Sequence, residues 1–464
     1  MRKNYVVILT VTDLNNLGFG VSHHEGLAVF VAGAVDGETV KAKVLTVKRS
    51  YAVAKTLEVL TPSPDRVGDD CPARGCGGCA YRTVTYAHET RLKRNYAEHA
   101  FRKAGITDAV IHPVVTPEDF DGQPLTAGYR NKAQFPIALT PEGEYRIGFY
   151  AAKSHRVVEA AACPLQNPAF LPILETLRAF FAEKRLTVWD ETSGEGLLRH
   201  IYLRRGEETG EILLTLVVNG AGIPHEEELV RRLRENHPAL VGILVNRNTE
   251  KTNVICGDTY RTLWGRDYLV DTLCGVRLKI RPAAFYQVNH AAATLLYRKA
   301  QELAALTGKE QLLDLYCGIG SIGLSMADAV REVIGVEIEP DAVKCARENA
   351  AESGIQNAYF YRGDAGDPGQ LLAGIDRPLH PDVVILDPPR KGSTPELLTH
   401  LATLSVPRIV YISCNVETLA RDAVILCQAG YRMGDIHLFD LFPRTGHVES
   451  VVCLERRLDV DMRR

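Results

Sequence analysis

The hydrophobic pattern of the chain changes twice, which divides its 464 residues into three predicted units. Over residues 1–62, short runs of alternating apolar and polar residues are separated by turn sequences such as NNLGFG and VDGE. Alternation with a period of two is typical of half-buried strands. Strands this short and closely spaced favour a small β-barrel of the oligonucleotide-binding type, which binds RNA or simply packs on its neighbour.

The second unit, residues 63–280, mixes strand-like runs such as QFPIAL with helix-like stretches such as FLPILETLRAFFAEK, which predicts an α+β domain. From 281 to 464 the pattern becomes strand, turn, helix, repeated, and ends with two strands that can form a hairpin. Such alternation is typical of a parallel sheet with helices on both faces. The expected fold class is therefore α/β, Rossmann-like, preceded by a β-barrel and an α+β domain.

Charge and composition narrow the function only locally. The net charge of -3 gives no overall case for a nucleic-acid partner, but residues 71–105 hold seven Arg or Lys against two Glu. No export signal or membrane-length apolar run is evident, so we expect a cytoplasmic protein without a membrane partner. Eleven cysteines in such a chain favour metal or catalytic roles over disulfides.

A cofactor pocket is predicted where LLDLYCGIGSIGL (312–324) leads from a strand through a glycine turn into a helix. Glu337 ends the next strand, where its carboxylate can accept both ribose hydroxyls, and Asp364 follows the third strand, beside an adenine. The residues needed to hold a pyrophosphate are missing. The set fits S-adenosylmethionine (SAM) better than a nicotinamide cofactor or a turn that serves only packing.

Three reactive side chains are predicted to meet at the carboxyl edge of this sheet. Asp387, in VILDPPR, and Cys414, in SCN, follow the fourth and fifth strands. If the last strand returns antiparallel beside the fifth, Glu449 begins at the same edge. The alternative for Cys414 is a buried small hydrophobic residue.

A thiolate beside a SAM methyl group suggests pyrimidine chemistry. Carbon C5 of a pyrimidine becomes nucleophilic once a thiolate adds at C6, which is the role expected of Cys414. A base must later remove the C5 proton so that the cysteine can leave, and Glu449 is the candidate.

A second group of cysteines lies outside this site. CPARGCGGC supplies Cys71, Cys76 and Cys79, and AACPLQ supplies Cys163. Three thiolates in one loop and a fourth brought in by folding can form a four-sulfur site, and the spacing permits zinc or an iron–sulfur cluster.

These motifs, with FYQVN (285–289), LDPPRKG, SCNVETLARD and DLFPRTGHVESV, resemble the RNA uracil-C5 methyltransferases, in particular the branch that acts on 23S rRNA. The resemblance covers nearly the whole chain, and the barrel is similar to a TRAM domain. It implies methylation of uridine C5 in 23S rRNA through a covalent adduct between cysteine and C6, with RNA as partner and no obligate protein partner.

The resemblance also assigns roles to individual residues. It implies that Gln287, Tyr316, Glu337 and Asp387 contact SAM, that Cys414 is the nucleophile and that Glu449 is the base. It favours a [4Fe-4S] cluster at the four cysteines, although the family usually has five residues between the first two cysteines and this chain has four. Arg130 and Lys132, in GYRNKAQFPI, are candidate phosphate contacts or plain surface charge.

Other functions compete with this hypothesis. The same chemistry on tRNA is one, although that branch typically lacks the barrel and the cysteine cluster. A cytosine-C5 enzyme would also use a thiolate. An RNA-binding iron–sulfur protein without methyl transfer is a further alternative, against which intact Cys414, Glu449 and Asp387 argue.

Overall fold

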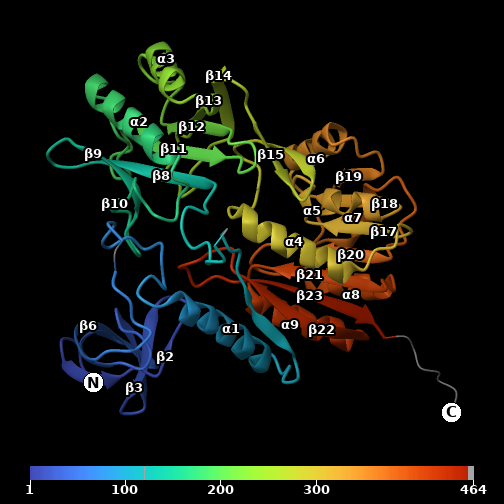
Figure 1. Cartoon of the computed structure of the whole chain (residues 1–464), viewed down its shortest axis with the longest axis horizontal. Helices are drawn as coiled ribbons and strands as arrows, with labels where there is room; N and C mark the ends of the chain where they lie inside the picture. The colour runs from blue at the N-terminus through green and yellow to red at the C-terminus, as the bar shows by residue number, and fades with distance from the viewer. Residues whose placement is uncertain (70, 120, 458–464) are drawn as a thin grey trace.

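The computed structural model describes residues 1–69, 71–119 and 121–457, and shows three units. In Figure 1 the N-terminal unit lies at the lower left, the central unit above it and the C-terminal unit on the right. Within the described ranges, no helix combines the length and apolar character needed to cross a bilayer.

The N-terminal unit is a six-stranded sheet that encloses its own apolar core, as predicted for a small β-barrel. Inward and outward positions alternate along β1, so that Val7 and Leu9 are buried while their neighbours face solvent. In spatial order the strands are β1 (Val6–Thr10), β5 (Thr39–Val47), β6 (Tyr51–Thr61), β4 (Leu27–Ala32), β3 (Phe19–His24) and β2 (Asp13–Leu14).

The central unit is a seven-stranded, mostly antiparallel sheet covered on one face by two helices, α2 (Phe170–Lys184) and α3 (Glu226–Asn236) (Figure 1). In spatial order its strands are β10 (Val157–Glu159), β9 (Tyr145–Tyr150), β8 (Lys132–Leu139), β11 (Leu198–Arg205), β12 (Ile212–Val218), β13 (Leu240–Arg247) and β14 (Thr259–Gly265). Every residue of β12 is buried, as expected for a central strand.

The C-terminal unit contains an eight-stranded sheet with helices on both faces. In spatial order its strands are β19 (Ala358–Arg362), β18 (Glu332–Glu337), β17 (Gln311–Leu315), β20 (Val383–Leu386), β21 (Arg408–Ser413), β23 (Glu449–Arg456), β22 (Tyr431–Phe439) and β7 (Ile111–Val115). β17 to β21 are mutually parallel, and β23 is antiparallel to both of its neighbours. This confirms the predicted Rossmann-like fold and the predicted return of the last strand beside the fifth.

Successive residues of the inner strands enter two separate cores, one on each face of the sheet. On β20, Ile385 belongs to one core and Leu386 to the other. The first core includes α4 (His290–Ala304), α5 (Ser321–Ser325), α6 (Pro340–Glu352) and the hairpin β15 (Leu269–Leu273) and β16 (Val276–Ile280). The second includes α1 (Tyr86–Lys103), α8 (Pro395–Thr403) and α9 (Val416–Gln428), with α7 (Pro368–Ala373) beside α8.

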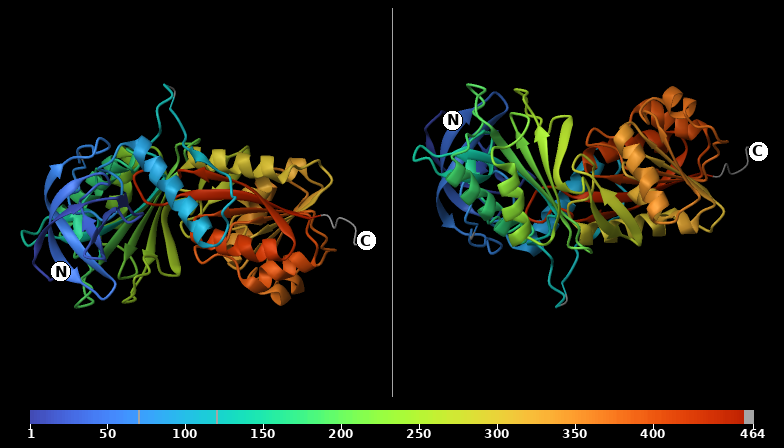
Figure 2. Two further views of the ribbon diagram at one scale, coloured as in Figure 1. Left: turned by 90° about the horizontal axis from the view of Figure 1, so that it is seen from below. Right: turned by 90° about the horizontal axis from the view of Figure 1, so that it is seen from above.

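The segment from α1 to β7 lies with the C-terminal sheet, although the sequence analysis placed residues 63–280 in the central unit. β7 pairs in parallel with β22 and forms the edge of the sheet, while α1 packs against α9. Figure 2 shows α1 extending from the N-terminal unit along the C-terminal strands. The hairpin β15–β16 also contributes to a C-terminal core, so both ends of the range 63–280 pack with the C-terminal sheet.

Candidate active site

The glycine turn after β17 leaves open space for a ligand. Tyr316 and Gly318 have positive φ angles of 63° and 55°, and the amide of Gly318 donates to the Glu337 carboxylate at 3.0 Å. A Cβ on Gly318 would have no heavy atom within 4 Å, whereas one on Gly320 would lie 2.9 Å from the Phe360 ring. Gly320 is therefore needed for packing, and Gly318 is where a ligand can approach the backbone closely.

Buried carboxylates surround this turn. Asp314 is fully buried, and its Oδ2 accepts from the amide of Gly323 at 2.9 Å while Oδ1 has no partner among the described residues. Burial raises the pKa of Asp314 to about 7, with further contributions from Asp387 and Glu337, and burial raises the pKa of Asp387 to about 7. A cationic ligand would offset this repulsion, so the site fits the positively charged sulfonium of SAM.

Cys414 and Glu449 lie opposite each other on adjacent strands. The pairing of β21 with β23 ends at Ser413 and Ser450, so one further step along the antiparallel register places Cys414 across from Glu449. Burial raises the pKa of the Cys414 thiol to about 11, with Glu449 and then Asp387 adding to the shift. Burial, with Asp387 adding, also raises the pKa of Glu449 to about 8. The predicted meeting of thiol and carboxylates is therefore present.

The other residues predicted to contact SAM lie around the same edge. Tyr316 lies at the turn after β17. Burial raises the pKa of Tyr316, a hydrogen bond with Ser393 opposes the shift and the Asp364 carboxylate adds to it. Asp364 Oδ1 accepts from the amide of Gly366 at 2.8 Å. Gln287 is buried just before α4, and its carbonyl accepts from Asn131 Nδ2 at 3.0 Å. Their places fit a cofactor site, and their roles stay predictions.

Arg390 is a member of the site that the sequence analysis did not single out. Its positive charge opposes the upward pKa shifts of both Cys414 and Glu449. Its Nη2 lies 3.5 Å from Nε2 of His447. The position of Arg390, three residues after Asp387 in the DPPR motif, was the available signal.

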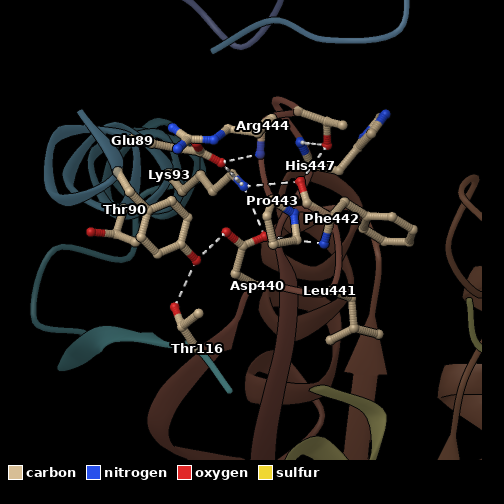
Figure 3. A network of polar contacts seen from close by, with 12 residues as sticks. Glu89, Thr90, Lys93, Thr116, Asp440, Leu441, Phe442, Pro443, Arg444 and His447 are labelled. Carbon is tan, nitrogen blue, oxygen red and sulfur yellow. Dashed lines mark hydrogen bonds and ion pairs between the residues drawn. The ribbon is translucent and has the colours of Figure 1, made fainter. Parts of the chain in front are cut away.

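A buried polar network holds the loop that precedes Glu449 (Figure 3). Lys93 Nζ, on α1, donates to Glu89 Oε1 at 2.7 Å and to Asp440 Oδ1 at 2.8 Å, and all three side chains are fully buried. Glu89 also accepts from the backbone amide of Arg444 at 2.7 Å. A helix some 350 residues earlier in the chain thus positions the loop that leads to the candidate base.

The four cysteines outside the active site converge, as expected. Cys71, Cys76 and Cys163 pack against one small apolar cluster. Burial raises the pKa of Cys79 to about 12, and the other three thiols add to the shift, led by Cys163. Within the described ranges, no group of three or more His, Cys, Asp or Glu side chains has the geometry of a site for a single metal ion. The expected iron–sulfur cluster thus stays a hypothesis.

Arg130 and Lys132 lie near the junction of the central and C-terminal units. The Arg130 guanidinium lies 6.0 Å from the centre of the Phe442 ring, over its face, and the ring points away from the Glu89–Lys93 network (Figure 3). Burial, with Arg204 adding, lowers the pKa of Lys132 to about 8. Both are placed where a phosphate could be bound, and that role stays a prediction.

The parallel sheet, the open glycine turn and the acidic residue ending the second strand define the class of SAM-dependent methyltransferases. The family model described as tRNA (uracil-5-)-methyltransferase matches residues 251–457, and the TRAM domain model matches residues 4–57. The chain belongs to the family of SAM-dependent RNA uracil-5-methyltransferases and carries an N-terminal TRAM domain.

Similar proteins extend over the whole chain. An uncharacterised RNA methyltransferase of Halalkalibacterium halodurans is 38% identical, and one of Gloeobacter violaceus is 37% identical, each over 98% of both chains. The crystal structure of the tRNA (uracil-54, C5)-methyltransferase of Pyrococcus abyssi in complex with S-adenosyl-L-homocysteine is 27% identical. It has a TM-score of 0.78 and covers 96% of this chain and 99% of that chain. These matches confirm the family and the fold class expected from the sequence.

Proposed function

We propose that this protein methylates C5 of a uridine in 23S rRNA, in the cytoplasm, through a covalent adduct between Cys414 and C6 of the base. The observation that carries the chemistry is the register of β21 and β23, which places Cys414 across from Glu449 beside Asp387 and the open glycine turn. A nucleophile, a base and a cofactor pocket therefore share one edge of the sheet.

In the proposed reaction the Cys414 thiolate forms a bond to C6, and the electron pair of the C5–C6 double bond moves onto C5, C4 and O4. The bound SAM supplies a methyl group activated by its sulfonium. Once C5 is methylated, Glu449 removes the C5 proton, the double bond re-forms and the Cys414 sulfur leaves as thiolate. Arg390 favours the thiolate because its charge lowers the pKa of Cys414 against the effect of burial.

The residues that would hold SAM are those placed around the glycine turn. Glu337 would accept the ribose hydroxyls, and Asp364 would lie beside the adenine. Gln287, Tyr316 and Asp387 complete the proposed pocket. The charge of Asp387 raises the pKa of both Cys414 and Glu449, so it lies near both, which suits a contact near the reacting sulfonium.

The choice of 23S rRNA rests on the sequence resemblance, in which the barrel and the cysteine motif occur together. tRNA is the second candidate, and a specific observation favours it. The Pyrococcus abyssi structure, named for tRNA, covers 96% of this chain, so the presence of the barrel region does not by itself separate the two substrates.

Mapping the methylated uridine tests the proposal. In a strain that lacks the gene, 5-methyluridine is expected to disappear from one or more positions of 23S rRNA and to remain in tRNA, as measured by mass spectrometry of nuclease fragments. Restoring the gene is expected to restore the mark, whereas the Cys414→Ala gene is not. Loss from tRNA with intact 23S rRNA would identify the second candidate as correct.

We further propose that Cys71, Cys76, Cys79 and Cys163 bind one [4Fe-4S] cluster. Support comes from their convergence and from the mutual repulsion of their thiolates, which a positively charged iron centre would offset. The cluster would be structural, since methyl transfer needs no redox step. It would stabilise the loop whose residues Ala80 and Tyr81 donate backbone hydrogen bonds to the carbonyl of Arg444, at 3.0 and 3.1 Å.

Anaerobically purified protein is expected to be brown and to contain roughly four irons and four acid-labile sulfides per chain, as ordinary four-thiolate ligation requires. Cys79→Ser is expected to remove most of the iron. Cys256→Ser, which changes a half-buried cysteine outside the group, is the matched control and is expected to keep it. Colourless protein with one zinc per chain would contradict the cluster.

A further inference from the structure

The central sheet has a hollow on the face that α2 and α3 leave uncovered. The hollow has a volume of about 490 Å³, and its lining includes Tyr150, Trp189 and His200. A second hollow of about 220 Å³ also contacts Tyr150 and His200, and extends to Arg130 and Val288. The two hollows therefore adjoin at Tyr150 and His200, and together they form a depression that extends from the central unit to Arg130 and Val288.

The alternation of side chains along two strands explains this depression. On β8, and on β11 from His200 onward, the odd-numbered positions, such as Phe135 and Ile201, pack under the helices, so the even-numbered positions face the other side. Before His200 the register of β11 shifts, and Arg199 also lines the depression. On that side Tyr202 docks the C-terminal unit through a hydrogen bond of its hydroxyl to the carbonyl of Pro282 at 2.7 Å. His200, two residues before Tyr202 on β11, lies in the depression.

Four buried polar atoms in this depression have no partner among the described residues: Arg130 Nε, Gln166 Oε1, Arg199 Nε and His200 Nδ1. Arg199, Gln166 and His200 are only 5%, 7% and 8% exposed. Buried polar groups are almost always hydrogen-bonded, because a lost partner is costly. Burial lowers the pKa of His200 to about 4, so the ring is neutral and can donate or accept a hydrogen bond.

Aromatic surface accompanies these groups. The Trp189 ring is half-buried, and the Arg199 guanidinium lies 4.6 Å from its centre. Tyr150 lies between the two hollows, with its hydroxyl 3.4 Å from His200 Nε2. Aromatic rings beside buried donors, acceptors and arginines are the combination that binds unstacked bases of single-stranded RNA.

We propose that this depression binds one unpaired nucleotide of the RNA substrate, distinct from the methylated uridine. Its base lies against Trp189 and Tyr150 and is hydrogen-bonded by His200 and Gln166. Its phosphate lies toward Arg130 and Lys132. The proposal rests on an RNA substrate, which family membership supports, and not on whether that RNA is 23S rRNA or tRNA.

Hydrogen bonds and a ring contact connect the basic end of the depression to segments of the candidate active site. The amide of Asn131, between the two basic residues, donates to the carbonyl of Val288 at 2.9 Å, and its side chain donates to the carbonyl of Gln287. Arg130 lies over the ring of Phe442, in the loop that leads to Glu449. A nucleotide in the depression would therefore fix the position of a uridine near it in the RNA.

The two tryptophans of the chain provide the test. Trp189 and Trp264 are both in the central unit, and each has an arginine guanidinium 4.6 Å from its ring centre, so Trp264 is a matched control outside the depression. Unmodified transcripts of 23S rRNA and of tRNA serve as probes. In the Trp264→Phe variant, the fluorescence emission of Trp189 is expected to change when the transcript that serves as substrate binds. With Trp189→Phe, emission from Trp264 is expected to stay constant.

Kinetics give the second measurement. Trp189→Ala is expected to raise the RNA KM about tenfold, the loss of one base–aromatic stack, with kcat and SAM binding unchanged. Trp264→Ala is expected to leave the RNA KM unchanged, and thermal melting checks that both variants are folded. Two results would contradict the proposal and show that the depression holds only water. One is a folded Trp189→Ala protein with the wild-type RNA KM, and the other is Trp189 emission that stays constant when RNA binds. The transcript that is methylated, 23S rRNA or tRNA, identifies the substrate, and this result is independent of whether the depression binds a nucleotide.

Discussion

Cys414→Ala is expected to reduce methylation of RNA to background, because C5 of uracil has too little electron density to attack a methyl group until a nucleophile adds at C6. The register of β21 and β23 brings Cys414 to Glu449, and it brings no other cysteine of the described residues to that position. No other cysteine is therefore expected to substitute for Cys414. Transfer of a radioactive methyl group from SAM to unmodified RNA measures the loss.

Cys427→Ala is the matched control for this experiment. Cys427 is a half-buried cysteine near the end of α9, the same helix that begins after Cys414, and it is expected to retain wild-type activity. Because the side chain of Cys414 is small, Cys414→Ala is expected to keep SAM binding and the melting temperature. Methylation by Cys414→Ala at a rate within tenfold of wild type would exclude this residue as the nucleophile.

The proximity of the proposed catalytic pair could be predicted from sequence because it depends on local order. Cys414 and Glu449 are only 35 residues apart, and the chain between them forms helix α9 and the hairpin β22–β23, whose second strand lies beside β21. The hydrophobic period of the strands and the position of each polar residue at a strand end were sufficient to predict that the two side chains meet. Ligand sites in such sheets lie beyond the carboxyl ends of the strands.

The support for that pair could not be predicted in the same way. Lys93 pairs with Asp440, 347 residues later, and β7 joins the far edge of a sheet whose other strands begin some 200 residues downstream. Long-range pairings of this kind leave little trace in local periodicity. In the sequence, Lys93 contributes to a basic segment, yet in the structure it is fully buried between two carboxylates.

The depression on the central sheet illustrates a third case. His200 and Tyr202 lie on a strand whose residues are nearly all buried, so the pattern reads as an ordinary central strand. The pairing of β11 with β8 shows that even-numbered positions form a polar face, where His200 Nδ1 has no partner among the described residues. This polar face was therefore concealed by a pattern typical of a core.

Glu449→Gln is expected to accumulate a covalent protein–RNA adduct. The thiolate can still add at C6 and the methyl group can still transfer, but no base then removes the C5 proton, so elimination stalls. Turnover is expected to fall by about 100- to 10,000-fold, the usual contribution of a general base. Since burial raises the pKa of Glu449 to about 8, glutamine closely matches the neutral acid present in the free protein, and the fold is expected to tolerate it.

The adduct is measured as a band of reduced mobility that survives denaturing gel electrophoresis and is removed by nuclease. Glu417→Gln, in the exposed first turn of α9, is the matched control and is expected to turn over normally. The double variant Cys414→Ala, Glu449→Gln is expected to give no band, because the bond to C6 cannot form. In the wild type, turnover is expected to rise with pH toward and beyond 8, since Glu449 accepts the proton only when it is ionised and Cys414, whose pKa is raised to about 11, adds to C6 only as a thiolate. Glu449→Gln should keep only the part of this pH dependence that comes from Cys414. Normal turnover by Glu449→Gln, or a band from the double variant, would contradict the proposed roles of both residues.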